Sequence, residues 1–238
     1  MATMTLDELV AQLRQAFGEG LRAVVLYGSA ATGEHIAKRS DYNVLVLVDT
    51  IDFELLRREA AIARSWIEAG NPPPLTLTMT EWRASADVFP MEYADILERN
   101  RVLYGTPPFD GIAVERRDLR LQLEYQAMGK LLQLRQGILA SGGDRKRLAE
   151  LLGASVTTFM VLFRALLRYE GATPPTEYEA LAREVGSRAG LDPAPFVRVI
   201  RHARGAERIG EPELMEVVSG YLAGVRRLAQ YIDQQGAR

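Results

Sequence analysis

The sequence predicts an α+β fold, in which a small domain with a mixed sheet is followed by an all-helical bundle. Three observations lead to this prediction. Strand-like and helix-like patterns mix over residues 1–110, a Gly-Thr-Pro-Pro-Phe-Asp-Gly segment breaks the chain at residues 105–111, and only helical periodicity follows. We therefore assign residues 1–110 to the first domain and residues 111–238 to the second.

The first domain opens with an amphipathic helix. Thr5 is its expected N-cap and Glu8, three positions later, completes a capping box, while apolar residues recur at helical spacing as far as Phe17. Glycine and proline punctuation separates the elements that follow. These are strands at residues 23–27, 75–80 and 102–104, a strand that opens at residues 40–43, and helices at residues 53–69 and 90–99.

The most informative stretch joins the first two strands. Gly28 lets the backbone pass close to a ligand, and a helix beginning after the turn would direct its first N–H groups there, with the Ser29 hydroxyl as a further donor. Side chains alternate along a strand, so Asp41 and Asn43 are expected on one face. The stretch therefore predicts an anion beside an Asp-bound cation, for which polyphosphate with Mg²⁺ is the natural pairing.

This arrangement resembles the nucleotidyltransferase signature of the DNA polymerase beta superfamily. In that signature an apolar residue and Gly-Ser are followed, about a dozen residues later, by Asp-x-Asp in an apolar strand, and Tyr27, Gly28, Ser29 and Asp41 fit it. The order of the two domains is similar to that of the aminoglycoside nucleotidyltransferases, in which the second substrate lies between the two parts. The resemblance implies a magnesium site at Asp41 and Asn43 and a nucleoside triphosphate as ligand.

The sequence departs from this pattern at two places. Asn43 stands where the family has its second metal-binding carboxylate, and a neutral amide oxygen holds Mg²⁺ less strongly. The family also has an aspartate on the third strand as proton acceptor, but the polar positions there are Thr76, Thr78 and Thr80, and a threonine is no general base at neutral pH. Magnesium is therefore expected to bind weakly or not at all. Recovery of transfer would need Asn43→Asp together with an aspartate at position 76 or 78.

Several acids after the third strand are candidates to replace the missing carboxylates. Glu81 is the nearest, but strand alternation places it with the leucines, and a solvated strand end is the favoured interpretation. Acids in the first turn are also what a helix N-terminus favours, so structural roles are expected for the others. These are Asp87, Glu92, Asp95 and Glu98.

The second domain is expected to contain helices at residues 116–140, 145–169, 177–189 and 193–208, and one more beyond them. The first carries Leu121, Tyr125, Met128, Leu132 and Leu139 on one side. In the last helix, apolar residues are spaced 4-3-4-3-4 and form either a seam within the bundle, which we favour, or a helix pair between the subunits of a homodimer. They are Leu214, Val218, Tyr221, Val225, Leu228 and Ile232.

Two groups of arginines are candidates for anion binding. Arg116, Arg117 and Arg120 open the second domain near the expected interdomain cleft, so they are preferred for contacts with polyphosphate. The second group follows one face of a later helix, where a solvated surface is the favoured interpretation. It contains Arg198, Arg201, Arg204 and Arg208, with His202 nearby.

Composition restricts the classes of function. With 47% apolar and 25% charged residues the chain has a globular composition, and a net charge of −2 argues against nucleic-acid binding through bulk positive charge. The absence of cysteine and the isolated His35 and His202 argue against zinc. No apolar run reaches the length of a membrane span and the N-terminus lacks signal-peptide features, so a cytoplasmic protein without a membrane partner is expected.

Three functions follow from these observations. The first, which we prefer because it explains Asn43 and the threonines of the third strand, is a catalytically degenerate nucleotidyltransferase-fold protein that binds nucleoside triphosphate weakly between its domains. The second is an active magnesium-dependent enzyme that transfers a nucleotidyl group to a hydroxyl of a small molecule or macromolecule. The third, a protein-interaction or oligomerisation module, rests only on the seam of the last helix.

Overall fold

The computed structural model describes residues 4–32 and 42–235 of the chain. It divides into two compact units, residues 1–115 and residues 116–238. A four-stranded sheet lies in the first unit and helices alone make up the described part of the second, so the predicted α+β architecture is confirmed.

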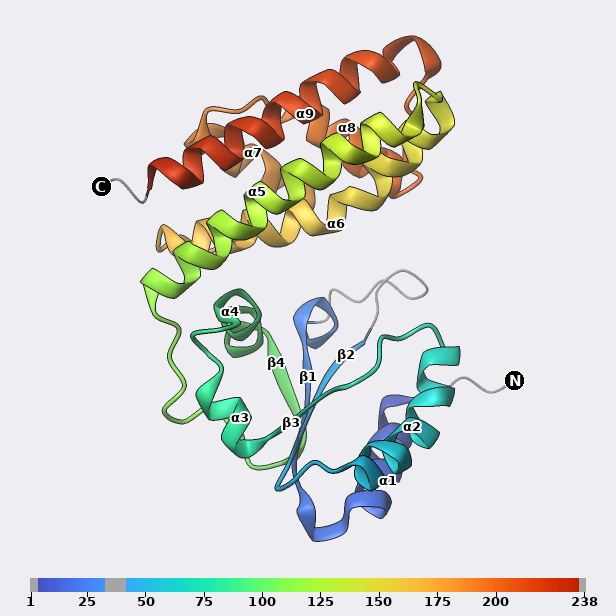
Figure 1. Ribbon diagram of the computed structural model, residues 1–238, viewed down its shortest axis with the longest axis vertical. Helices are drawn as coiled ribbons and strands as arrows, with labels where there is room; N and C mark the ends of the chain where they lie inside the picture. Colours follow the sequence, from blue (N-terminus) through green and yellow to red (C-terminus); the bar gives the residue numbers. More distant parts are fainter. Residues whose placement is uncertain (1–3, 33–41, 236–238) are drawn as a thin grey trace. The chain divides into compact units, whose positions relative to one another are not determined.

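The first unit is built on a mixed sheet with strand order β3-β2-β1-β4 (Figure 1). The central strand β1 is antiparallel to both β2 and β4, and β3 runs parallel to β2 at the edge. The strands are β1 (Leu21–Tyr27), β2 (Asn43–Val48), β3 (Leu75–Thr78) and β4 (Asn100–Gly105).

Helices cover both faces of this sheet. Val44, Val46 and Val48 of β2 point to one face, where they pack with Trp66 and other side chains of the first two helices. Leu45 and Leu47 alternate with them and pack against aromatic side chains of the next two helices. The helices of this unit are α1 (Leu6–Phe17), α2 (Phe53–Glu68), α3 (Met79–Ala84) and α4 (Pro90–Glu98), with the 3₁₀ turns η1 (Gly18–Gly20) and η2 (Gly28–Thr32).

Local capping explains two helix boundaries in the first unit. Thr5 and Glu8 form the capping box predicted for α1. The third strand is shorter than predicted, because Thr78 and Glu81 form a second capping box that starts α3. The alternation at positions 79 and 80 therefore belongs to a helix and not to a strand.

The second unit is a bundle of helices. Both α6 and α9 pack against α5, and α6 also contacts α7 and α8 (Figure 1). The helices are α5 (Arg116–Ser141), α6 (Arg145–Tyr169), α7 (Tyr178–Ala189), α8 (Ala194–Ala203) and α9 (Glu211–Gln234). Of the described helices, α6 alone has the length and apolar composition of a membrane span, but 56% of that window is buried inside the protein, as in the core helix of a bundle.

The apolar seam of α9 lies inside this bundle. All six of its predicted residues, from Leu214 to Ile232, are buried. Tyr221 packs against the rings of Phe159 and Phe196, and its hydroxyl lies 2.9 Å from the Ser155 Oγ. The favoured interpretation of the seam is therefore confirmed, and this face of α9 is not available to a second subunit.

Candidate functional site

The predicted turn lies where β1 ends and β2 begins. Tyr27, the last residue of β1, pairs with Asn43, the first residue of β2. Gly28 follows with φ 78°, a left-handed conformation that side chains disfavour, and starts η2. Its N–H donates a 3.0 Å hydrogen bond to the carbonyl of Arg99, so the turn is attached to the segment between α4 and β4.

The space beside Gly28 is lined by two polar side chains. A Cβ atom placed on Gly28 would lie 3.5 Å from Nδ2 of Asn43 and 3.7 Å from Oδ2 of Asp95. Asn43 and Asp95 come from β2 and α4, so the fold brings together two side chains that are far apart in sequence. Gly28 is buried, and a side chain at this position would contact both an amide and a carboxylate.

Acidic residues of α4 set the charge around this turn. Asp95 Oδ1 accepts a 2.6 Å hydrogen bond from Nη2 of Arg99, one helical turn later, and both side chains are partly buried. Burial, followed by the negative charges of Asp95 and Glu92, raises the pKa of the Tyr27 hydroxyl. The surroundings of Tyr27 are therefore acidic, and Asp95 is the candidate acid whose carboxylate lies next to Gly28 together with the amide of Asn43.

Part of the predicted site lies outside the described residues. This applies to Asp41, the expected first metal ligand, and of Ser29 only the backbone is described. Among residues 4–32 and 42–235, no group of three or more acidic or histidine side chains is arranged to hold a metal ion. The described residues alone therefore do not make a magnesium site, and the assignment of magnesium to Asp41 and Asn43 stays a prediction.

The threonines of the third strand face away from Asn43. In the parallel pairing of β3 with β2, Thr76 lies opposite Val46 and Thr78 opposite Val48, which point to the face covered by α1 and α2. The Thr76 hydroxyl donates a hydrogen bond to the carboxylate of Glu59 on α2, and burial raises the pKa of that carboxyl. An aspartate at position 76 or 78 would point to this face, so the expectation that it could replace the missing base is wrong.

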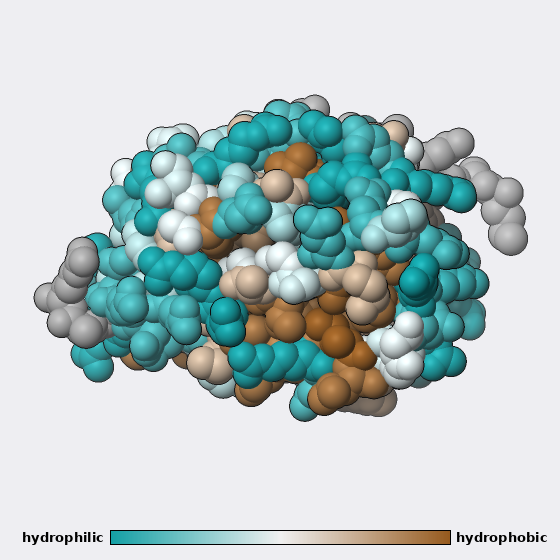
Figure 2. Space-filling view, turned by 90° about the horizontal axis from the view of Figure 1, so that it is seen from above, coloured by the Kyte–Doolittle hydropathy of each residue, from teal (hydrophilic) through white to brown (hydrophobic). Residues whose placement is uncertain are grey.

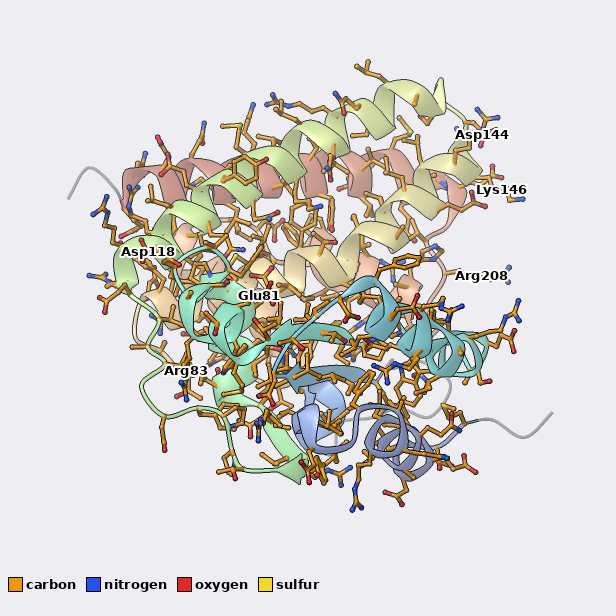
Figure 3. The ribbon with its side chains drawn as sticks, turned by 60° about the horizontal axis from the view of Figure 1, so that its bottom comes forward. Glu81, Arg83, Asp118, Asp144, Lys146 and Arg208 are labelled. Atoms are coloured by element: carbon orange, nitrogen blue, oxygen red, sulfur yellow. The ribbon has the colours of Figure 1, made fainter. Side chains whose placement is uncertain are left out.

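Glu81 has a structural role. Glu81 is labelled in Figure 3. Its carboxylate accepts a 2.7 Å hydrogen bond from the N–H of Thr78, and its own N–H donates to the Thr78 hydroxyl. The hydrogen bonds from Thr78 hold the pKa of Glu81 below its usual value. Glu81 is therefore a helix cap, and the interpretation of this residue as a solvated strand end is corrected.

The preferred arginines of the second unit differ in what they contact. Arg116 Nε donates to the carbonyl of Tyr169 at 3.1 Å and its guanidinium lies 4.4 Å from the centroid of the Tyr169 ring, which ties the start of α5 to the end of α6. Arg120 pairs with Glu124 at 2.7 Å, and Arg117 is exposed. The assignment of Arg116 and Arg117 to polyphosphate stays a prediction.

Three arginines of the second group, Arg198, Arg201 and Arg204, form an ion-pair network within the helical unit. Arg201 binds Glu179 through two hydrogen bonds of 2.9 Å and 3.0 Å, and it also contacts Glu207. Arg198 and Arg204 pair with further glutamates around α8. These guanidinium groups serve to join α7, α8 and α9, so a structural role accounts for them without a bound anion.

Comparison with known proteins identifies a related fold. No protein-family model and no curated protein matches the sequence. Among solved structures, the chain is similar to the crystal structure of spectinomycin adenyltransferase AAD(9) from Enterococcus faecialis with ATP and spectinomycin. The TM-score is 0.59 at 12% sequence identity, and the match covers 94% of this chain and 99% of the other, so it extends over both the sheet unit and the helical unit.

Proposed function

From the two-part nucleotidyltransferase fold that this chain shares with an aminoglycoside-modifying enzyme, we propose that it binds a nucleoside triphosphate weakly and is catalytically degenerate. The observation that carries the proposal is Asn43. It lies beside the glycine turn, at the position where the resembled family has a metal-binding carboxylate. The ligand of the similar structure, ATP, supports a nucleotide as the ligand class.

Weak binding follows from the charges available at the turn. A carboxylate at Asp41 with the amide oxygen of Asn43 would offer Mg²⁺ one charged and one neutral ligand. When bound, the ion would neutralise phosphate charge. The acidic residues Glu92 and Asp95 add negative charge to the surroundings, which disfavours a triphosphate that carries no cation.

Loss of transfer follows from the lack of a proton acceptor on the third strand. Thr76 and Thr78 point to the face covered by α1 and α2, and Glu81 caps α3. General-base assistance contributes about a hundred- to ten-thousand-fold to such reactions, so its loss alone would reduce transfer to near background. Any residual acceptor is expected to be a small molecule with a hydroxyl group, as in the similar structure with spectinomycin.

The second candidate, an active nucleotidyltransferase, is favoured by Asp95. This carboxylate lies beside Asn43 and Gly28 and comes from α4, so it could supply the negative charge or the proton acceptor that β2 and β3 lack. One of its oxygens, Oδ1, is already engaged by the guanidinium of Arg99 at 2.6 Å. The two candidates are therefore separated by whether Asp95 takes part in turnover.

Titration calorimetry with a non-hydrolysable triphosphate and Mg²⁺ tests the binding proposal. Asn43→Asp restores a charge that, about 4 Å from the cation, contributes on the order of 4 kcal/mol before desolvation and repulsion from nearby acids reduce it. We expect affinity to increase at least about tenfold. The matched control is Gln15→Glu, which makes the same change of charge on an exposed position of α1 and should leave affinity unchanged. Equal affinity of wild type and Asn43→Asp would contradict the proposed role of position 43.

Pyrophosphate release decides between the two candidates. Wild type, Asn43→Asp and Asp95→Asn are incubated with each nucleoside triphosphate and a panel of hydroxyl acceptors, and thermal unfolding confirms that each variant is folded. We expect release near background from all three proteins. Robust release by wild type that Asp95→Asn abolishes would overturn the degenerate assignment and establish Asp95 as the missing acid.

A further inference from the structure

Helix α5 has two apolar faces, of which the bundle uses one. The buried face consists of Leu119, Leu123, Ala127, Leu131 and Leu134. On the opposite side lie five large apolar side chains that are 46–80% exposed. We call them the α5 stripe, and they are Leu121, Tyr125, Met128, Leu132 and Leu139.

The α5 stripe is the main apolar surface of the described helical unit. Seven large apolar side chains are exposed in the described part of this unit, and five of them form the α5 stripe. The other two, Val161 and Met215, lie apart from it on α6 and α9. Figure 2 shows apolar residues gathered in one area of a surface that is otherwise mostly hydrophilic. Clustered exposed apolar residues of this kind mark interaction sites more often than scattered ones do.

The spacing of the α5 stripe identifies the kind of partner. Its residues follow each other at intervals of four, three and four, and Arg135 continues the series before Leu139. This is the heptad spacing with which one helix packs along another. A long helix with such a seam therefore fits another helix of similar length better than it fits a small ligand.

The spacing of these positions along α5 is symmetric about position 130. Leu121 and Leu139 are equidistant from it, as are Met128 and Leu132, and the remaining pair is Tyr125 with Arg135. We propose that the α5 stripe is the interface of a homodimer, in which α5 of two copies packs antiparallel about a two-fold axis. A two-fold interface requires a self-complementary surface, and the symmetric spacing of the α5 stripe supplies one.

The position of Arg135 favours a second copy over other occupants. Its side chain is exposed, and within the described residues no hydrogen bond or ion pair engages it. In the antiparallel pair it meets Tyr125 of the second copy, whose ring is 78% exposed and offers a cation–π contact. An arginine within an apolar stripe is costly against a lipid surface, whereas arginine and tyrosine are both enriched in protein interfaces.

The area available indicates a dimer of moderate affinity. The exposed fractions of the α5 stripe amount to about three whole side chains, or on the order of 500 Å² per copy if each contributes about 150 Å², the lower end of the range for aromatic residues. Two copies would bury about 1,000 Å², near the lower limit for a specific interface. Gly129 lies next to the crossing point, and a Cβ added there would meet no atom within 4 Å, so the two helices can approach closely.

Sedimentation velocity on the full chain tests the dimer. We expect wild type to change from monomer to dimer as its concentration rises through the micromolar range, and Leu132→Glu to remain monomeric. The matched control is Val161→Glu, which places the same charge on α6 at a side chain with the same 48% exposure as Leu132, and it should dimerise like wild type. Circular dichroism checks that both variants are folded.

Three outcomes would overturn the proposal. They are a wild type that stays monomeric at all concentrations, a Leu132→Glu variant that dimerises as well as wild type, and a Val161→Glu variant that dissociates equally. A monomeric wild type that instead sediments with anionic lipid vesicles would assign the α5 stripe to a membrane surface.

Disulfide trapping tests the antiparallel register. The chain contains no cysteine, so single cysteines report on one position each. A mixture of the Leu121→Cys and Leu139→Cys chains should cross-link efficiently on oxidation, because these positions face each other in the antiparallel pair. Each chain alone should not, since its two cysteines would lie about 27 Å apart along the helices. Cross-linking of Leu121→Cys with itself would indicate a parallel pair and contradict the proposal.

Discussion

The seam of α9 and the α5 stripe have the same spacing and opposite surroundings. Every seam residue of α9 is buried in the bundle, whereas every residue of the α5 stripe is at least 46% exposed. The difference arises because α5 has two apolar faces. The face that contains Leu119 and Leu134 packs against α6 and α9, so the α5 stripe on the other side is left exposed. Heptad spacing therefore shows that a helix has an apolar face, but not whether the same chain covers it.

Truncation of matched leucines should give the largest contrast between these two surfaces. Leu228→Ala removes a fully buried side chain of α9 and is expected to lower the free energy of unfolding by about 2–5 kcal/mol. Leu132→Ala in the α5 stripe should lower it by less than about 1 kcal/mol in the monomer. Urea unfolding at concentrations below dimerisation measures both. Equal losses would show that the α5 stripe is part of the core.

Added methyl groups at helical glycines should have opposite effects on the two helices. A Cβ on Gly224 of α9 would lie 2.5 Å from Cε2 of Phe196, so Gly224→Ala is expected to destabilise by about 1–3 kcal/mol through overpacking. Gly129→Ala on α5 meets no atom within 4 Å and should stabilise by about 0.5–1 kcal/mol, because alanine is the better helix former. Thermal unfolding of the two variants at concentrations below dimerisation checks the signs, and a loss of stability in monomeric Gly129→Ala would show that another part of the same chain covers this part of α5.

Acid should weaken the contact between α7 and α8 through Glu179. The hydrogen bonds from Arg201 lower the pKa of Glu179 in the folded protein, so this pair stabilises above the usual glutamate pKa and is lost as pH falls through the lower folded value. Because both side chains are partly exposed, we expect an effect below about 1 kcal/mol. Glu179→Gln should unfold more easily than wild type at neutral pH and equally easily in strong acid. A constant difference at every pH would contradict this cause.

The sequence predicted the fold well where local chemistry determines it. The capping box of Thr5 and Glu8 started α1 as expected. The same motif recurs at Thr78 and Glu81, where the alternation of leucine and threonine led us to extend the strand into a helix. The sequence contains both patterns. The capping residues are the better guide, because their side chains satisfy the free N–H groups at the start of a helix, whereas alternation of side chains does not determine where the backbone hydrogen bonds go.

The candidate site was only partly predictable, because it depends on contacts between distant elements. Gly28 and Asn43 were predicted from their position in adjacent strands, and the structure places them together. The orientation of Thr76 required the pairing of β3 with β2, since alternation gives two faces without saying which one meets the turn. Asp95 was one of five candidate acids, and only the packing of α4 distinguishes it from the others.

The hydrogen bond from Gly28 to Arg99 also has a consequence for the order of folding. It joins residues about 70 positions apart, and closing so long a loop is costly until the intervening strands and helices are in place. During synthesis, β1 can pair with β2 well before β4 leaves the ribosome and covers its other edge. The turn that carries the candidate site is therefore among the last parts of the first unit to reach its final conformation, and a nascent chain that ends before residue 99 cannot complete it.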